Sequence, residues 1–352
     1  MCNEISCLHK KIYGLLLISI VLTGVLVLEG CGGETPAVDD KHEVTVNIGT
    51  QQLVNDEMLA IIRGYFKEEM DAEVNIISFE AGDIRNAMIA GDIDFAMLGS
   101  SSAVLGVANG MDVKLIWIHE IIGTAEQLVS REGSGIYTIS DSKGKRIATP
   151  FTSTSHYSLL KALKWYGIDD KDVILLDMQM PDIYAAWIRN DIDAAYGWEP
   201  VVSKLLKSGK TVLTSEDLAE KGIITADVEI VRSAFAKEHP DIVKAYIRAV
   251  NRATSDYLKD PESVYQDFAE HLDIDKNESE KQVSGFIWLP VEMQIDKQYL
   301  GTTSQKGDFV KTVKETAEFL YGQGSLAAKP DDFKMEDFVE PKYSEVVANP
   351  QD

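Results

Sequence analysis

Apolar and polar positions follow two alternating patterns over the first part of the chain beyond residue 43. Val44–Ile48 alternates with the two-residue period of a half-buried strand, and Val74–Phe79 and Asp94–Leu98 form further strand-like runs. Between these runs, Met58–Glu69 and Asp83–Ala90 have the composition of helices. Strands that alternate with helices in this way predict α/β units with parallel pairing.

One helix–turn–strand segment occurs twice. Ile84–Gly99 aligns with Ile183–Trp198 without a gap, at a spacing of 99 residues. Because helix–turn–strand is a common unit, chance is one explanation of the match. The other is a pair of α/β lobes of related build that face a shared cleft, since open α/β sheets bind ligands at the carboxyl ends of their strands.

Helical spacing dominates the later part of the chain. Residues 239–272 place apolar side chains at helical intervals behind a proline, and Lys311–Tyr321 forms another amphipathic pattern. The acidic, proline-containing segment from Lys329 onward is expected to lie over the surface.

The N-terminal pattern predicts an export signal. Ile12–Leu28 is an uncharged apolar run behind Lys10 and Lys11, and it is short for a membrane span, which takes about 20 residues. A basic flank, an apolar core and a small residue before a boundary are typical of a secretory signal. The boundary Leu28-Glu29-Gly30-Cys31 resembles a bacterial lipobox, although Glu29 replaces the usual small neutral residue. Cys31 is therefore expected to carry a lipid; an uncleaved anchor and a buried helix are the alternatives.

Composition and charge exclude several function classes. The chain has 34 basic and 57 acidic residues and a formal charge of −23, which opposes the attraction that nucleic-acid binders rely on. Cys31 is the last of three cysteines, so a mature chain beginning there has no disulfide, no cysteine nucleophile and no cysteine metal ligand. GxGxxG, Walker and GxSxG motifs are absent, and His119-Glu120 lacks the second histidine of HExxH. These features predict no metal and no cofactor.

Two runs of hydroxyl side chains follow expected strands. Thr152–Ser155 come after Arg146–Thr149, and Ser100–Ser102 come after Leu98. Hydroxyls beside the unpaired N–H groups of a helix start can bind an anion without lysine or arginine. Ordinary N-capping is the alternative for both runs, although capping needs one hydroxyl rather than four. The pattern therefore predicts an anion held from both lobes by neutral donors.

Acidic and aromatic residues could hold a cation. Trp187, Tyr196, Trp198 and Glu199 lie on or just after the second copy of the repeat, and Asp227 precedes a further strand-like run. Carboxylates and aromatic faces both bind ammonium groups. Core packing is the alternative for each tryptophan, and a turn or cap is the alternative for Asp227.

The segment Pro150–Leu160, with the sequence PFTSTSHYSLL, resembles the taurine-type substrate-binding proteins of ABC importers. The resemblance extends from about Val44 to Gly324. Further positions match the same family pattern, and these are Leu98–Ser101, Ala185–Trp187, Asp191–Asp193, Tyr196, Trp198, Pro200 and Asp227-Val228.

This resemblance implies a type II periplasmic-binding-protein clamshell. Each of its two lobes would hold a mostly parallel sheet flanked by helices, with crossovers near residues 129–133 and 229–232 and a helical C-terminal part. The chain would then divide into a signal peptide (1–30), a tether (31–42), lobe I (43–130 and 232–340), lobe II (131–231) and an acidic tail (341–352).

The resemblance also implies a function. The chain is expected to be an extracytoplasmic, lipid-anchored protein that binds a small organosulfonate, with taurine as the first candidate, and delivers it to an ABC permease with its ATPase. The ligand contacts would be Gln51, Asn55, Ser100, Ser101, Glu126, Thr152, Ser153, Thr154, His156, Trp198 and Asp227.

Within this set, the hydroxyl runs and His156 would face the sulfonate, Asp227 and Gln51 the amine, and Trp198 would wall the pocket. Asn55 stands where the family often has glutamate. The alternative ligands are another alkanesulfonate, a betaine-like zwitterion and a thiamine-precursor pyrimidine. An enzyme of the same fold, similar to a desulfinase, is the alternative class.

Overall fold

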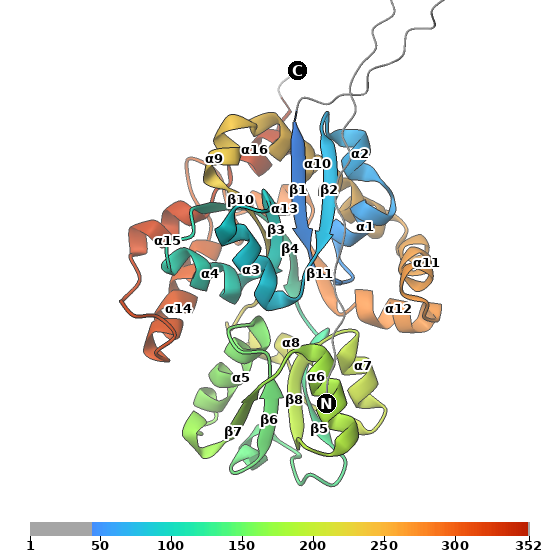
Figure 1. Ribbon diagram of the computed structural model, residues 1–352, viewed down its shortest axis with the longest axis vertical. Coiled ribbons are helices and arrows are strands. Elements are labelled where there is room, and N and C mark those ends of the chain that lie inside the picture. Colours follow the sequence, from blue (N-terminus) through green and yellow to red (C-terminus); the bar gives the residue numbers. More distant parts are fainter. Residues whose placement is uncertain (1–43, 351–352) are drawn as a thin grey trace, which may run out of the picture. The chain divides into compact units, whose positions relative to one another are not determined.

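The computed structural model describes residues 44–350. The expected signal peptide, the tether and the lipid-attachment residue Cys31 lie outside the described residues. Within residues 44–350 two β-sheets are each flanked by helices (Figure 1). No helix in this range is both long enough and apolar enough to cross a membrane.

The strands form a six-stranded and a five-stranded sheet. The first sheet contains β1 (Thr45–Thr50), β2 (Glu73–Ser78), β3 (Phe95–Gly99), β4 (Val113–Ile122), β10 (Ala226–Arg232) and β11 (Phe286–Trp288), in the order β11-β4-β10-β3-β1-β2. The second contains β5 (Glu126–Arg131), β6 (Arg146–Thr149), β7 (Ile174–Asp177), β8 (Ala194–Trp198) and β9 (Gly209–Thr214), in the order β7-β6-β8-β5-β9.

Helices connect these strands and cover both faces of each sheet. The helices up to β10 are α1 (Asp56–Ile62), α2 (Tyr65–Glu69), α3 (Ala81–Ala90), α4 (Ser100–Ala108), α5 (Thr154–Trp165), α6 (Met180–Arg189), α7 (Val201–Leu206) and α8 (Ser215–Ala219). The later helices are α9 (Ser233–Glu238), α10 (Pro240–Lys259), α11 (Pro261–Leu272), α12 (Lys276–Val283), α13 (Val291–Gln294), α14 (Phe309–Gly322), α15 (Asp332–Phe338) and α16 (Lys342–Ala348).

The predicted two-lobed α/β arrangement is confirmed, but the sheets are mixed rather than mostly parallel. β1 pairs in parallel with β2 and β3, and β6 pairs in parallel with β7 and β8. β10 and β5 pair antiparallel with both of their neighbours. The difference arises because β5 and β10 begin at the cleft, where the chain enters from the other lobe, whereas their neighbours β8 and β3 end there. The crossing strands therefore run in the opposite direction.

The chain crosses between the sheets earlier than the sequence suggested. β5 already belongs to the second sheet and β10 already belongs to the first, so the crossings precede Glu126 and Ala226. Residues 129–133 and 229–232, expected to be the crossovers, coincide largely with the later parts of these strands. Val129 and Ile230 are fully buried there, and their packing between two neighbouring strands keeps both segments inside the sheets.

The repeat noted in the sequence forms the same structure in both lobes. α3 with β3 and α6 with β8 begin and end 99 residues apart. Asp94 accepts a backbone hydrogen bond from Asn47 at 2.9 Å, and Asp193 accepts one from Arg146 at 2.8 Å. Each aspartate therefore ties its turn to the neighbouring parallel strand, which favours related lobes over chance similarity.

The equivalence of the lobes extends to the two crossing strands. In the sheet register, Asp227 pairs with Gly99 and Glu126 pairs with Trp198. Gly99 and Trp198 are matching positions of the repeat, so Asp227 and Glu126 occupy matching positions in the two lobes. Each lobe thus places one acidic side chain at the start of its crossing strand.

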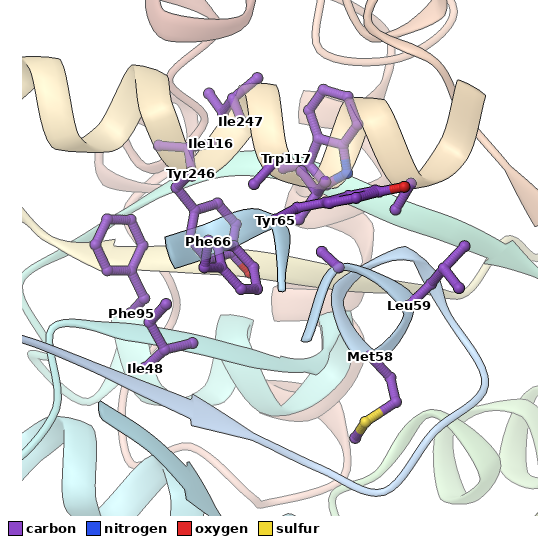
Figure 2. Packing of buried hydrophobic residues seen from close by; sticks show 14 of the residues in the cluster. Ile48, Met58, Leu59, Tyr65, Phe66, Phe95, Ile116, Trp117, Tyr246 and Ile247 are labelled. Atoms are coloured by element: carbon purple, nitrogen blue, oxygen red, sulfur yellow. The ribbon is translucent and has the colours of Figure 1, made fainter. Parts of the chain in front are cut away.

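Apolar cores lie on both faces of the first sheet. On one face, under α1, α2 and α10, the rings of Phe95 and Tyr246 stack at 4.7 Å and Phe66 lies 5.0 Å from Tyr246 (Figure 2). The other face packs against α3, α4, α14 and α15. Full burial of each large apolar side chain contributes about 1.5–3 kcal/mol, so these cores hold the strand ends firmly in place.

The C-terminal segment is not an acidic tail over the surface. α15 and α16 bury Met335, Phe338 and Tyr343 against the first lobe. The Tyr343 hydroxyl donates to the Ala236 carbonyl at 2.8 Å, and the Ser344 hydroxyl donates to the Ile116 carbonyl at 2.9 Å. The helical spacing of the apolar residues in this segment outweighs its acidic composition.

Candidate functional site

A cleft lies where strands of both sheets end. It contains about 620 Å³ of space between protein atoms, part of which is open solvent. Both lobes contribute to its walls, which consist of Gln51, Leu53, Gly82, Gly99, Ser102, Ile122, Glu126, Pro150, Phe151, Thr152, Ser153, Thr154, Gln179, Trp198, Asp227 and Phe286.

The structure brings most of the predicted ligand contacts together at this cleft. Those that line it are Gln51, Glu126, Thr152, Ser153, Thr154, Trp198 and Asp227. Asn55, Ser100, Ser101 and His156 are not among the lining residues. Of these four, Asn55 is fully buried, and its side-chain oxygen accepts a hydrogen bond from the Met58 N–H at 3.0 Å, which caps α1.

Two of the three serines at the start of α4, Ser100 and Ser101, do not line the cleft. The Ser100 hydroxyl accepts a hydrogen bond from the Ala226 N–H at 3.4 Å. The buried Ser101 hydroxyl has no partner among the residues that the structure describes. Ser102, one residue further on, lines the cleft instead. Of the three serines in the hydroxyl run at the start of α4, Ser102 is therefore the one that lines the cleft.

Four helices begin at the cleft, namely α3, α4, α5 and α6. Gly82, Gly99, Ser153 and Gln179 lie at their first turns and line the cleft. Of the four, α5 has a side-chain hydrogen bond at its N-cap and the other three have none. The first N–H groups of a helix lack partners within the helix and carry partial positive charge, so the cleft is suited to an anion.

Thr152 adopts a strained backbone conformation at the cleft. Its φ angle is +64°, which is rare for a β-branched residue and is typical of functional sites. Its N–H donates to Nδ1 of His156 at 3.2 Å, and the His156 ring stacks on Phe151 at 4.4 Å. Burial lowers the pKa of His156 to about 4, so the ring is neutral at pH 7 and Nδ1 can accept. His156 therefore holds the backbone of Thr152 in place through this hydrogen bond.

Arg85 adds a cation that the sequence analysis did not select. Its Nη1 lies 3.2 Å from the Ser102 hydroxyl in the first lobe and 3.5 Å from the Thr152 hydroxyl in the second. No described carboxylate pairs with it, and burial lowers its pKa. The expectation of purely neutral donors therefore changes, because a guanidinium lies behind both hydroxyls. The sequence feature that could have indicated Arg85 is its place near the start of a helix that directly follows a strand.

The acidic part of the cleft centres on Asp227, which is 6% exposed. Gln51 donates its side-chain N–H to the Met97 carbonyl at 3.0 Å, which leaves its side-chain oxygen as an acceptor. Leu53, Ile122 and Phe286 add apolar walls. Burial raises the pKa of Asp227, so a cation next to this carboxyl would favour its ionised form.

Glu126 is the matching carboxyl of the second lobe, and it is already hydrogen-bonded. The hydroxyls of Thr154 and Ser215 donate to it at 2.5 Å and 2.9 Å. Burial raises the pKa of Glu126 to about 7. Because the Thr154 hydroxyl donates to Glu126, it is not a free donor for an anion. Thr154 itself lines the cleft.

A buried polar cluster lies under α1 and α10. The two ring nitrogens of His119 contact Asp56 at 2.5 Å and Glu229 at 3.0 Å. The Tyr246 hydroxyl lies 2.7 Å from Glu229 and 2.6 Å from Glu57. Burial alone would lower the pKa of His119, but the Asp56 and Glu229 carboxylates raise it well above its ordinary value. His119 is therefore a buried imidazolium that compensates nearby carboxylates.

This cluster is not a metal centre. Across residues 44–350, no group of three or more His, Cys, Asp or Glu side chains has an arrangement that could hold a metal ion. The sequence missed the cluster because its members come from four separate elements. The cleft itself combines helix starts and a guanidinium with a buried carboxyl, and this combination suits a short molecule that carries both an anionic and a cationic group.

Comparison with known proteins gives a consistent result. A family model described as NMT1/THI5 like matches residues 56–264. The taurine-binding periplasmic protein of Escherichia coli (strain K12) is 34% identical over 301 residues, covering 82% of this chain and 90% of that protein. A putative aliphatic sulfonates-binding protein of Bacillus subtilis (strain 168) is 28% identical over 321 residues, covering 89% of this chain and 92% of that protein.

Solved structures share the fold. The alkanesulfonate-binding protein SsuA from Xanthomonas axonopodis pv. citri, solved bound to MOPS, matches with a TM-score of 0.70 at 19% identity. The match covers 84% of this chain and 98% of that one. The chain therefore belongs to the NMT1/THI5-like family and has the two-lobed fold of the periplasmic sulfonate-binding proteins.

Proposed function

We propose that this chain is the extracytoplasmic solute-binding protein of an ABC importer. It binds a small organosulfonate between its two lobes, with taurine as the first candidate, and delivers it to the permease without chemical change. The observation that carries this proposal is the paired chemistry of the cleft, which joins four helix starts and Arg85 to the buried carboxyl of Asp227. The names of the relatives, which refer to taurine and aliphatic sulfonates, support the same ligand class.

The sulfonate would lie at the starts of α4 and α5. Unpaired backbone N–H groups and the hydroxyls of Ser102 and Thr152 can donate to its oxygens. Arg85 lies behind both hydroxyls and adds a positive charge without having to touch the ligand. This arrangement holds a monovalent anion in a chain whose formal net charge is −23.

The amine would lie between Asp227 and the side-chain oxygen of Gln51. Trp198 and Phe286 form part of the surrounding wall, and aromatic faces attract ammonium groups. A buried carboxylate without a cation is costly, and so is a buried ammonium without a carboxylate. A ligand that carries both charges therefore satisfies both parts of the cleft.

Ligand binding would couple to closure of the lobes. Gly99 of the first lobe lies so close to the second that a Cβ at this position would be 3.0 Å from the Thr154 methyl. A ligand that contacts both lobes stabilises this closed arrangement over an open one. The permease would then recognise the closed shape.

The test is a paired titration of wild type and Asp227→Asn with taurine and with ethanesulfonate, which lacks the amine. The substitution should weaken taurine binding by ~2–4 kcal/mol, the range for breaking a desolvated charge pair, and should affect ethanesulfonate much less. Asp241→Asn is the matched control, because Asp241 lies on α10 with its side chain 88% exposed, and neither ligand should respond to it.

Two results would contradict the proposal. Equal losses for both ligands in Asp227→Asn would mean that Asp227 shapes the fold rather than recognising an amine. Equal affinities of the wild type for both ligands would make the ligand a simple alkanesulfonate. A thermal-shift panel that adds glycine betaine and the thiamine pyrimidine tests the other ligand classes, and a larger shift with either than with taurine would replace the sulfonate assignment.

The N-terminal pattern of the sequence bears on the location of the protein. We propose that the lipid on Cys31 anchors the protein to the outer face of the cell membrane and that residues 31–42 act as a tether. A small, polar segment of this kind behaves as a flexible linker. The anchor would keep the binding protein close to its permease.

A further inference from the structure

Glu120 is a buried carboxyl directly behind the acidic part of the cleft. It lies opposite Asp227 in the pairing of β4 with β10, beside a register shift in β10. Glu120 is 0% exposed, and neither of its side-chain oxygens has a hydrogen-bond donor among the described residues. The two acidic side chains therefore face each other, and one of them, Asp227, lines the cleft.

The charged groups around this pair do not supply a free cation. His119, the neighbour of Glu120 on β4, already binds Asp56 of α1 and Glu229 of β10 through its two ring nitrogens. Glu126 of β5, whose pKa burial raises to about 7, interacts electrostatically with Asp227 from the second lobe and supplies no cation. Among these described groups, the His119 imidazolium is the cation near Asp227 and Glu120, and its two ring nitrogens already bond to other carboxyls.

Two ionised carboxylates cannot hydrogen-bond to each other, because both are acceptors. One added proton turns the pair into a donor and an acceptor and removes one of the two like charges. Burial and the charge of Asp227 raise the pKa of Glu120 well above its ordinary value, and burial raises the pKa of Asp227. Both effects favour a protonated pair at neutral pH.

The second lobe shows the contrast. Glu126 occupies the position that matches Asp227. It accepts hydrogen bonds from the hydroxyls of Thr154 and Ser215. At the same place in the first lobe, the partner is a second carboxyl. Asp227 therefore lacks the hydroxyl donors that Glu126 has. Because Asp227 lines the cleft, a ligand can supply the missing donor.

We propose that the Asp227–Glu120 pair shares one proton in the ligand-free protein and that the ammonium group of a bound ligand displaces this proton to solvent. The O–H bond of the shared carboxylic acid breaks, the proton passes to the buffer, and the ammonium takes its place as the cationic donor. The inference rests on the proposed function, because it requires a ligand that carries an ammonium group. It assigns Glu120 as a positioning residue that makes amine recognition sensitive to pH.

The expected consequence is a linkage between affinity and pH. Affinity for taurine should rise with pH, by up to about tenfold per pH unit for one released proton, as long as the amine of the ligand stays protonated. Affinity for ethanesulfonate should not rise in this way, because that ligand gives the pair no cation.

The test is calorimetry of the wild type at pH 7 in phosphate and in Tris, two buffers with different enthalpies of ionisation. With taurine, the measured enthalpy should differ between the buffers in the direction of proton release. Taurine binding with the same enthalpy in both buffers, repeated at pH 6 and pH 8, would overturn the inference. Absence of any taurine binding would instead overturn the proposed function, and this inference with it.

Variants then locate the proton. Glu120→Gln should abolish the difference between the buffers, because the glutamine N–H can donate to Asp227 in the ligand-free protein and the pair then holds no shared proton to release. Glu57→Gln is the matched control, since Glu57 is equally buried in the same lobe but bonds to Thr50 and Tyr246 rather than facing Asp227, and it should keep the difference. Loss of the difference in both variants would assign the proton to the wider cluster and contradict the pair. The buffer dependence of the wild-type binding enthalpy tests for proton release without requiring either variant to fold.

Discussion

Replacing Arg85 with glutamine tests the positive charge at the anion end of the cleft. Nη1 of Arg85 lies 3.2 Å from the Ser102 hydroxyl and 3.5 Å from the Thr152 hydroxyl. Glutamine can still donate a hydrogen bond to a nearby hydroxyl, so the substitution mainly removes the charge. Because no described carboxylate pairs with Arg85, its loss leaves no buried anion behind.

The magnitude follows from the geometry. A sulfonate oxygen that accepts from either hydroxyl is two hydrogen bonds away from the guanidinium, roughly 6 Å. At an effective dielectric constant of about 20, two unit charges at this distance interact by about 3 kcal/mol. Partial exposure and solvent screening reduce this value, so we expect a loss of about 1–3 kcal/mol, which is about 5- to 150-fold in affinity.

The assay is calorimetric titration of wild type and Arg85→Gln with taurine and ethanesulfonate. Both ligands should lose affinity to a similar degree, since Arg85 acts on the sulfonate that they share. Arg189→Gln is the control, because Arg189 lies at the end of α6 with its side chain 62% exposed and carries the same charge. Unchanged affinity for both ligands in Arg85→Gln would refute the reasoning, and a loss confined to taurine would place the guanidinium at the wrong end of the ligand.

Three further predictions address stability and anchoring. Glu126 has a folded-state pKa of about 7 against an ordinary value of 4.5, so its protonation stabilises the fold below pH 4.5 and this stabilisation, about 3 kcal/mol, is lost as the pH rises through 7. In urea unfolding, the free energy of unfolding of Glu126→Gln should therefore rise relative to that of the wild type between pH 5 and pH 8. A difference between the two proteins that does not change with pH would count against this assignment. His119→Leu should lower the free energy of unfolding by about 3–5 kcal/mol, because it leaves Asp56 and Glu229 buried without their cation; a loss below about 1 kcal/mol would show that the cluster is held together by other means. Cys31→Ala should release the protein from the membrane fraction, whereas mass spectrometry that finds a free Cys31 thiol in membrane-bound mature protein would exclude the lipid anchor.

The local units of this protein could be predicted from patterns of neighbouring residues. The apolar patterns of Val44–Ile48 and Val74–Phe79 correspond to β1 and β2 within one residue at most ends, and Arg146–Thr149 is β6 as predicted. The repeat at a spacing of 99 residues indicated two related lobes. The hydroxyl run at Thr152–Ser155 marked the helix start that faces the cleft. These features could be predicted because each depends on residues that are neighbours along the chain.

Some helical predictions needed correction for local reasons. Met58–Glu69 is two helices, α1 and α2, which are separated at Gly64, where φ is +74°. Asn55 was expected at the ligand, but it lies at the N-cap of α1. An asparagine just before a helix serves either purpose, and the pattern of the surrounding residues does not distinguish them.

The contacts between side chains that are distant in the sequence depend on the three-dimensional fold. Arg85 reaches Thr152 across the two lobes, and Glu120 faces Asp227 because of the register of β4 with β10. The antiparallel entry of β5 and β10 likewise follows from where the chain crosses between the lobes. Strand register and lobe packing depend on the sum of many long-range contacts rather than on any local pattern. The sequence therefore specified the helix start that suits an anion, while the fold supplied the guanidinium behind it and the second carboxyl beside Asp227.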